Sequence, residues 1–143
     1  MQLTKFTDFS IRVLIYAGLK DNDELSQISA ICESYEISKN HLIKVVHELA
    51  QLGYLETIRG KNGGIRLAMD ASEISIGELV RQTEKHLNAF NCYTPACKIV
   101  KACTVKGVFH EATQAYLQVL DKYTLADVLE NRRSLAKVLG IDD

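Results

Sequence analysis

Apolar residues recur at helical spacing near the start of the chain. Between residues 7 and 19 they cover more than one face, which predicts a helix buried on two sides with Thr7 as its N-cap. Residues 25–35 carry a single apolar stripe, which predicts a shorter amphipathic helix. Cys32 lies on that stripe and is interpreted as a small buried side chain, since free cysteine is among the most buried residue types.

A third helix and a change of period follow. Residues 39–52 carry one apolar face between Ser38, a possible cap, and Gly53, a possible stop. Only three residues separate this helix from the one before it, which is typical of a helix-turn-helix unit, although any helical hairpin shares that spacing. The strand-like runs YLETIRG and IRLAM then flank a glycine-rich connection at residues 60–64, which predicts a β-hairpin. A hairpin at this place is a wing, so the pattern favours a winged helix-turn-helix.

The second half of the chain is expected to be helical around one irregular loop. Ser75 begins an S-x-x-E capping-box pattern before a short helix, and periodicity is lost after residue 86. Residues 105–123 then follow the i, i+3, i+4, i+7 rule of a long amphipathic helix. One or two short helices should complete the chain, with caps and a stop at Thr124, Ser134 and Gly140. The fold class is therefore mainly α with a small β-hairpin.

Composition and charge change this picture only locally. The 143 residues are 47% apolar and 24% charged, which is ordinary for a globular protein, and no apolar run is long enough to span a bilayer. No basic leader precedes the first helix, so a cytoplasmic protein without a membrane partner is expected. The net charge of −1 does not indicate a nucleic-acid partner, yet residues 38–66 hold five basic residues against two acidic ones.

Those basic residues lie where double-stranded DNA would lie on a winged helix-turn-helix. The first turn of a recognition helix reaches base edges, lysines neutralise phosphates, and an arginine beside a thin loop suits the minor groove. A solvated helix face or a plain surface hairpin would use the same residue types, so the combination is what favours DNA. The candidate contacts are Ser38, Lys39, Asn40, His41, Lys44, Arg59, Gly60, Lys61, Asn62 and Arg66.

Three cysteines fall in the predicted loop, with C-x4-C-x5-C spacing at Cys92, Cys97 and Cys103. In a reducing compartment such a group more often binds metal or does redox chemistry than forms a disulfide. Zinc or an iron–sulfur cluster would suit the thiols, but a two-iron cluster or a cubane needs a fourth ligand that the loop lacks. Asp8 and His110 are the visible candidates, and spacing alone does not choose between them.

Catalysis has no positive support in the sequence. No G-x-S-x-G, P-loop or H-E-x-x-H pattern occurs, and no histidine and acid are placed to activate a thiolate. We therefore expect the protein not to be an enzyme. A cysteine-based redox or electron-transfer protein is an alternative, although it would not need the basic residues of the helix and hairpin.

Four motifs together resemble the bacterial winged-helix iron–sulfur transcription regulators, and especially the nitric-oxide-sensing repressors among them. They are LTKFTDFSIRVLIY, SKNHLIKVVHELAQLGYLETIRGKNGGIRL, the three-cysteine loop, and YTLADVLEN, and they span nearly the whole chain. The resemblance implies a homodimer whose long helices cross-pack while two winged units grip a palindromic operator. It implies three segments: a DNA-binding domain at 1–72, a short helix and cysteine loop at 73–103, and a dimerisation helix with C-terminal helices at 104–143.

The same resemblance implies an iron–sulfur cluster as cofactor. In similar nitric oxide sensors a 4Fe-4S cubane is held by three cysteines and an aspartate of the partner's first helix, and the matching residues are Cys92, Cys97, Cys103 and Asp8. In a related regulator of cluster biogenesis a histidine three positions after the last cysteine completes a 2Fe-2S site, whereas Lys106 stands there in this chain. The expected effector is nitric oxide, whose attack on the cluster releases the operator. A regulator of the same fold that senses iron or cluster status is the alternative.

Overall fold

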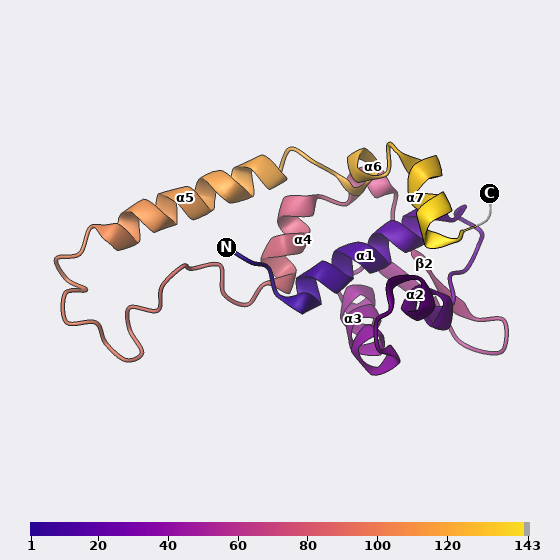
Figure 1. The fold of residues 1–143 in the computed structure, drawn as a ribbon, viewed down its shortest axis with the longest axis horizontal. Coiled ribbons are helices and arrows are strands. Elements are labelled where there is room, and N and C mark those ends of the chain that lie inside the picture. Colours follow the sequence, from indigo (N-terminus) through magenta and orange to yellow (C-terminus); the bar gives the residue numbers. More distant parts are fainter. Residues whose placement is uncertain (142–143) are drawn as a thin grey trace.

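The computed structural model describes residues 1–141, so the last two residues of the expected C-terminal segment, 142–143, lie outside it. It is mainly helical with one antiparallel hairpin, as predicted (Figure 1). The elements are α1 (Lys5–Leu19), α2 (Ile28–Tyr35), α3 (Lys39–Gln51), β1 (Leu55–Ile58), β2 (Gly64–Leu67), the 3-10 turn η1 (Ala71–Glu73), α4 (Ile76–Thr83), α5 (Val105–Leu120), α6 (Leu125–Val128) and α7 (Arg132–Leu139).

Helix α1 is the centre of the fold. It packs against α3, β2, α4, α6 and α7, and it buries Val13 and Leu14 completely, which confirms the expectation of burial on two sides. The prediction of Thr7 as its cap is wrong, because the Oγ1 of Thr4 accepts the N–H of Thr7 at 3.4 Å and the helix starts at Lys5. Thr7 lies instead in the first helical turn, where it is fully buried.

The helix-turn-helix unit forms, but its first helix starts at Ile28 and not at the predicted residue 25, because Ser26 pairs with Ile65 of β2 instead of joining the helix. The C-cap of α2 is Glu36, which lies in the left-handed region (φ 55°). The N-cap of α3 is Ser38, whose Oγ accepts the N–H of His41 at 3.4 Å. Helix α3 turns its apolar face into the core through Leu42, Val45, Val46 and Leu49. Cys32 is half-buried against the same core, and that burial raises the pKa of its thiol.

The hairpin is fixed by side chains and by two glycines. Its register pairs Leu55 with Leu67 and Ile58 with Gly64, and Ile65 is fully buried. A Cβ on Gly63 would overlap the carbonyl oxygen of Ile58, and one on Gly64 would lie 2.7 Å from the carbonyl oxygen of Ser26. Backbone bonds between Ser26 and Ile65, at 2.8 and 2.9 Å, anchor the hairpin to the chain before α2. The predicted wing is therefore held rigidly beside α2 and α3.

Helix α4 begins at the predicted cap but without the full capping box. Ser75 Oγ accepts the N–H of Glu78 at 3.3 Å, while the Glu78 carboxylate accepts from Gln82 at 3.1 Å instead of reaching back to Ser75. Helix α4 then ends at Thr83, three residues before the predicted loss of periodicity.

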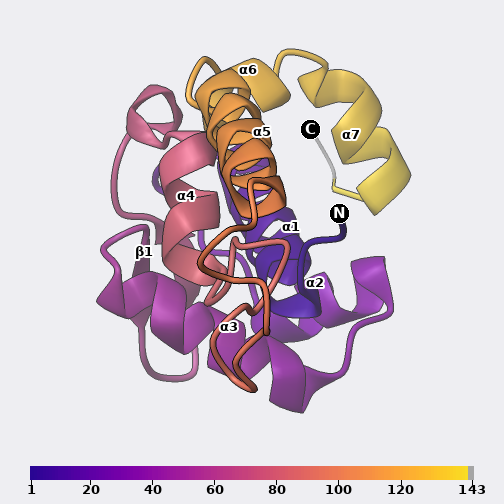
Figure 2. The same ribbon diagram turned by 90° about the vertical axis from the view of Figure 1, so that its left-hand side faces the viewer.

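The C-terminal helices return to α1. Figure 1 shows α6 and α7 beside the C-terminal end of α1, where Leu125, Leu129 and Ala136 join the core. In Figure 2, α6 lies at the top of the molecule and α7 at its upper right. Thr124 caps α6 as predicted, and Gly140 ends α7 at a φ of 66°. Helix α7 starts after Asn131, so the prediction of Ser134 as a cap is wrong.

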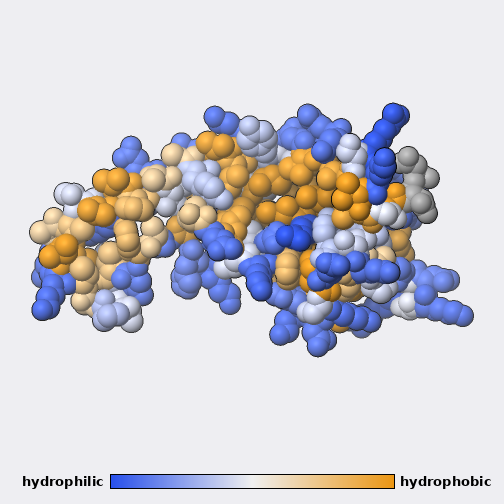
Figure 3. All heavy atoms as spheres, viewed as in Figure 1, coloured by the Kyte–Doolittle hydropathy of each residue, from blue (hydrophilic) through white to orange (hydrophobic). Residues whose placement is uncertain are grey.

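Helix α5 projects from this body along the longest axis of the molecule (Figure 1). It ends at Leu120, three residues before the predicted limit, and it buries only Thr113 and Leu117. Figure 3 shows apolar residues gathered along it. The exposed large apolar side chains of α5 are Val105, Val108, Phe109 and Val119, and Tyr123 is exposed in the turn that follows. Within residues 1–141, no helix is long and apolar enough to cross a lipid bilayer.

Candidate DNA-binding surface and cysteine loop

The start of α3 presents most of its predicted contacts to solvent. Ser38, Lys39, Asn40 and Lys44 are exposed because they lie opposite the buried apolar face of the helix. His41 is different, since its ring packs edge-on against Phe9 of α1 with 4.7 Å between the ring centroids. The first turn of α3 is thus a polar surface on which the His41 ring is held in place by Phe9 of α1.

The hairpin tip gathers the other predicted contacts. Arg59, Gly60, Lys61 and Asn62 are all exposed in the connection between β1 and β2. Arg66 lies farther back on β2 and is half-buried.

The cationic charge of Arg66 is already balanced. Its guanidinium donates to the Glu56 carboxylate at 2.8 Å, because the register places these residues opposite each other. That hydrogen bond raises the pKa of Arg66. Within residues 1–141, no carboxylate lies within 4.0 Å of the side-chain nitrogens of Lys39, Lys44, Arg59 or Lys61, so these four carry the uncompensated charge.

The cysteine loop lies at the opposite end of the long axis from the hairpin (Figure 1). Local turns shape it: the N–H of Cys97 donates to the Cys92 carbonyl at 3.0 Å, and that of Cys103 to the Ile99 carbonyl at 2.9 Å. The side chain of Asn91 braces the first turn by accepting from the N–H groups of Tyr93 and Thr94 at 3.2 and 3.0 Å. All three thiols are free, with Cys97 exposed and the other two half-buried. The loop thus presents three thiols that are not joined by a disulfide.

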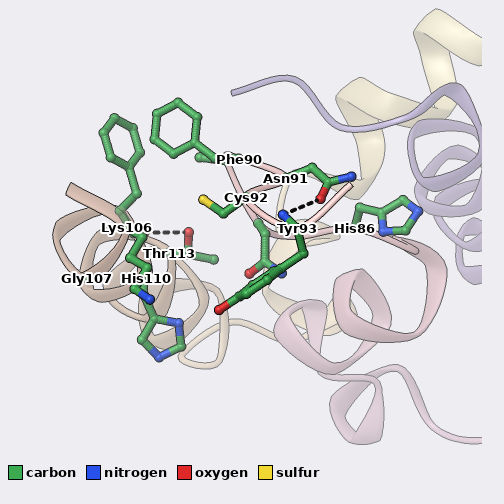
Figure 4. A pocket seen from close by; sticks show the side chains of 12 residues that line it. His86, Phe90, Asn91, Cys92, Tyr93, Lys106, Gly107, His110 and Thr113 are labelled. Atoms are coloured by element: carbon green, nitrogen blue, oxygen red, sulfur yellow. Dashed lines mark hydrogen bonds between the residues drawn. The ribbon is translucent and has the colours of Figure 1, made fainter. Parts of the chain in front are cut away.

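A cavity of about 690 Å³ lies between this loop and α5. Figure 4 shows Cys92 on the side of the loop that faces the helix, with Lys106 and His110 on the opposite wall. The rings of Phe90 and Phe109 meet edge-on with 4.6 Å between centroids, which joins the loop to the first turns of α5. The cysteine loop and α5 therefore form one unit.

The donor chemistry of the loop fits an iron–sulfur cluster. Thiolates are the ligands such clusters use, and here three of them share one loop with no disulfide between them. Within residues 1–141, no three His, Cys, Asp or Glu side chains already converge as a metal site.

Asp8 does not join the cysteines within one chain. The Arg12 guanidinium donates to both its carboxylate oxygens at 2.9 Å, on the surface of α1. The Arg12 guanidinium also lies 5.8 Å from the Phe9 ring centroid and 5.7 Å from that of Tyr35. Arg12 is not among the predicted site residues, although its i, i+4 spacing from Asp8 is the sequence signal for such a pair. The Phe9–His41 contact has no comparable signal, because it joins distant parts of the chain.

Comparisons with known proteins agree with the fold and narrow the function. Residues 3–131 match the Rrf2 family, described as an iron-dependent transcriptional regulator. The chain is 51% identical to the HTH-type transcriptional regulator NsrR of Bacillus subtilis (strain 168) over the full length of both. It is 49% identical to NsrR of Shouchella clausii (strain KSM-K16), over 97% of this chain and 95% of that one.

Solved structures share the fold at lower identity. The oxidized form of Staphylococcus aureus CymR matches with a TM-score of 0.75 and 23% identity over 91% of this chain and 97% of that one. IscR of T. potens matches with a TM-score of 0.74 and 21% identity over 92% of this chain and 88% of that one. The relatives are transcriptional regulators and not enzymes, which confirms that prediction and favours a regulator over a cysteine redox protein. The chain belongs to the Rrf2 family of transcriptional regulators.

Proposed function

We propose that this protein is a homodimeric, cytoplasmic repressor that binds a palindromic operator and releases it when nitric oxide reacts with an iron–sulfur cluster in the cysteine loop. The observation that carries the proposal is the loop itself. It presents three free thiols beside the long helix of a chain that is 51% identical to a regulator named NsrR. A cytoplasmic location is proposed because closely spaced cysteines that form no disulfide suit a reducing compartment.

DNA contact divides between α3 and the hairpin. Ser38, Lys39, Asn40 and His41 occupy the first turn of α3, where a recognition helix meets base edges, and Lys44 follows one turn later. At the hairpin tip, Arg59, Gly60, Lys61 and Asn62 reach phosphates or the minor groove. Arg66 contributes less than Arg59, because Glu56 already neutralises it.

Helix α5 supplies the dimer contact. Val108 is 62% exposed and Val119 is 51% exposed in the single chain, on the same face of the helix. Exposed apolar stripes of this length mark protein interfaces, and cross-packing two copies of α5 would cover both stripes at once. The two copies of α3 would then meet half-sites about one helical turn apart on the DNA.

The residues that would hold the cluster are Cys92, Cys97 and Cys103, with Asp8 of the partner subunit as fourth ligand. When bound, a cluster supplies iron atoms with which nitric oxide reacts. The carboxylate of Asp8 has about four lone-pair sites, so it can accept from Arg12 and still bind metal. A 4Fe-4S cluster is proposed over 2Fe-2S because of Lys106, in the first turn of α5. It stands three positions after the last cysteine, where a histidine completes the 2Fe-2S site of the related regulator, and its ammonium is no metal ligand.

Loss of the bonds between the cluster and its protein ligands would weaken DNA binding by changing how the two subunits are held together. The loop of one subunit and the first helix of the other would no longer be joined, so the two recognition helices would change spacing or tilt. A dimer that reads two half-sites needs both aligned, and a small displacement misaligns both.

The test is anaerobic purification followed by stepwise addition of nitric oxide while operator binding is followed. The operator is selected from random duplex DNA by the protein itself. We expect a coloured dimer that loses its visible absorbance band and its DNA together. A colourless protein whose DNA binding ignores nitric oxide would refute the proposal and leave a winged-helix regulator without a cluster.

One alternative has an observation in its favour. The matched family is described as iron-dependent, which favours a regulator that responds to iron or cluster supply. The same preparation distinguishes the two: release on addition of an iron chelator, with no release by nitric oxide, would support the iron-sensing alternative.

A further inference from the structure

Glu84 is a buried carboxylate at the point where α4 ends and the cysteine loop begins. Only 9% of the residue is exposed. One of its carboxylate oxygens accepts the backbone N–H of Thr4 at 2.7 Å and the hydroxyl of Thr4 at 2.9 Å. Its own N–H donates to the carbonyl of Val80 at 2.9 Å and closes α4. One residue therefore ends α4 and caps α1, 80 positions earlier in the chain.

A second buried contact runs beside the first. The hydroxyl of Thr7 donates to that of Thr83 at 2.9 Å, and Thr83 donates to the Leu79 carbonyl at 2.8 Å. Burial raises the pKa of Glu84, but the nearby Thr7 hydroxyl and the two hydrogen bonds from Thr4 outweigh it and hold this pKa below its usual value. The group is therefore an anion at the positive end of the α1 dipole, and its hydrogen bonds are charge-assisted.

The residues bound by Glu84 lead to the proposed sensing and reading sites. The carbonyl of Thr4 accepts the N–H of Asp8 at 3.0 Å, so Thr4 lies between Glu84 and the turn that carries Asp8. The next residue, Phe9, packs on His41 at the start of α3. In the other direction, the chain runs from Glu84 straight into the loop that bears Cys92.

We propose that Glu84 is a positioning residue that joins the root of the cysteine loop to the first turn of α1, so that displacement of the loop moves Asp8 and the recognition helix. This proposal rests on the proposed function, because it assigns the route by which the state of the loop reaches DNA. A residue that merely capped α1 would stabilise that helix without influencing the loop.

Asp127 provides a matched control. Its carboxylate accepts the N–H of Thr124 at 2.7 Å and the hydroxyl of Thr124 at 2.9 Å, the same donors at the same distances as at Glu84. Its partner is only three residues away, and the pair is exposed on α6. Removing Asp127 therefore removes an equivalent cap without breaking a long-range link.

The first measurements use the full-length protein without a cluster. In Glu84→Ala we expect the amides of Thr4, Thr7 and Asp8 to exchange on the order of tenfold faster, and Cys92 and Cys103 to be alkylated about threefold faster than in the wild type. Glu84→Gln keeps an acceptor for the Thr4 N–H and should fall between the two. Asp127→Ala should alter neither set, and Cys32 is the internal control for alkylation.

Faster exchange on α1 with unchanged loop thiols would overturn the proposal, because Glu84 would then be a cap of α1 only. Equal effects from Asp127→Ala would overturn it as well, because they would indicate general destabilisation. If Glu84→Ala does not fold, Glu84→Gln decides alone, and wild-type rates at both sites would overturn the proposal.

The last measurement is the ratio of operator affinities with and without the cluster. Glu84→Ala should lower this ratio by about fivefold, with the affinity of the cluster-free protein within about twofold of wild type. An unchanged ratio would overturn the proposed route. A wild-type ratio of one would refute the proposed function instead, while the exchange and alkylation rates would still decide whether Glu84 joins the loop to α1.

Discussion

The helix-turn-helix body and the arm formed by the cysteine loop and α5 use apolar residues in opposite ways. Helix α3 buries four apolar side chains in 13 residues, whereas α5 buries one in 16 and leaves Val108 62% exposed. The body is thus stabilised within one chain. The arm has its apolar face and its thiols in place, but the partners proposed for them, a second subunit and an iron–sulfur cluster, lie outside the single chain. Changes in the body should therefore alter folding, and changes in the arm should alter assembly and sensing.

The largest effect is expected from a cavity in the body. Leu42 is fully buried on α3, so Leu42→Ala should lower the free energy of unfolding by about 2–5 kcal/mol. Chemical denaturation of the cluster-free protein measures this loss. A change below about 0.5 kcal/mol would mean that α3 does not depend on the core seen here.

This part of the fold was predictable because its signals are local. The cap at Ser38 and the glycines of the hairpin act on residues within a few positions, and the apolar stripe of α3 is complete in the sequence. The N-cap of α1 was not predictable, because Thr4 and Thr7 both suit that role. The choice between them depends on their contacts with Glu84 and Thr83. Contacts between residues about 80 positions apart produce no recognisable spacing pattern in the sequence.

The site was predictable in its parts but not in its connections. The exposed residues of α3 and the hairpin tip lie where the winged pattern places them. The pairing of Arg66 with Glu56 depends on the strand register, which the sequence does not specify. The pairing of Asp8 with Arg12 is indicated in the sequence only by their four-residue spacing. The proposed fourth ligand, Asp8 of a second subunit, lies beyond one chain, and the sequence indicates it only by resemblance.

A charge in the arm should separate assembly from folding. Val108→Lys places an ammonium in the proposed interface between two copies of α5, and we expect the dimer to weaken on the order of 100-fold. Sedimentation equilibrium measures this change, and unfolding of the monomer should be unaltered. Gln114→Lys, on the polar side of the same helix, is the control and should leave the dimer intact. Equal effects from both variants would place the interface elsewhere.

The two hairpin arginines should differ in DNA binding. Arg59→Ala should reduce operator affinity about tenfold and lower the slope of log affinity against log salt by about one, because an unpaired cation at the tip is lost. Arg66→Ala, made together with Glu56→Ala so that no lone carboxylate remains, should have a smaller effect on both. Fluorescence anisotropy at several salt concentrations measures both quantities. A larger loss from the double variant would show that Arg66 contacts DNA despite its partner.

The junction between body and arm should make stability depend on acid pH. The pKa of Glu84 is lower in the folded protein than its usual value of 4.5, so its stabilisation is present above that pH and is lost as the pH falls through the folded value. Glu84→Gln lacks this titration. The difference in unfolding free energy between wild type and Glu84→Gln should therefore shrink below about pH 4.5. Comparison with the wild type cancels the other carboxylates, and a constant difference would contradict the assignment.

The smallest effect on folding should come with the largest effect on sensing. Cys97 is exposed in a loop that contributes nothing to the apolar core, so Cys97→Ser should change the unfolding free energy of the cluster-free protein by less than about 0.5 kcal/mol. The same variant should fail to form the visible chromophore on anaerobic reconstitution, because a hydroxyl does not replace a thiolate toward iron. Cys32→Ser should keep the chromophore while lowering stability, since its side chain packs against the core. The two cysteine variants then report on the two regions separately. Retention of the chromophore in Cys97→Ser would remove this thiol from the ligand set while leaving the description of the body unchanged.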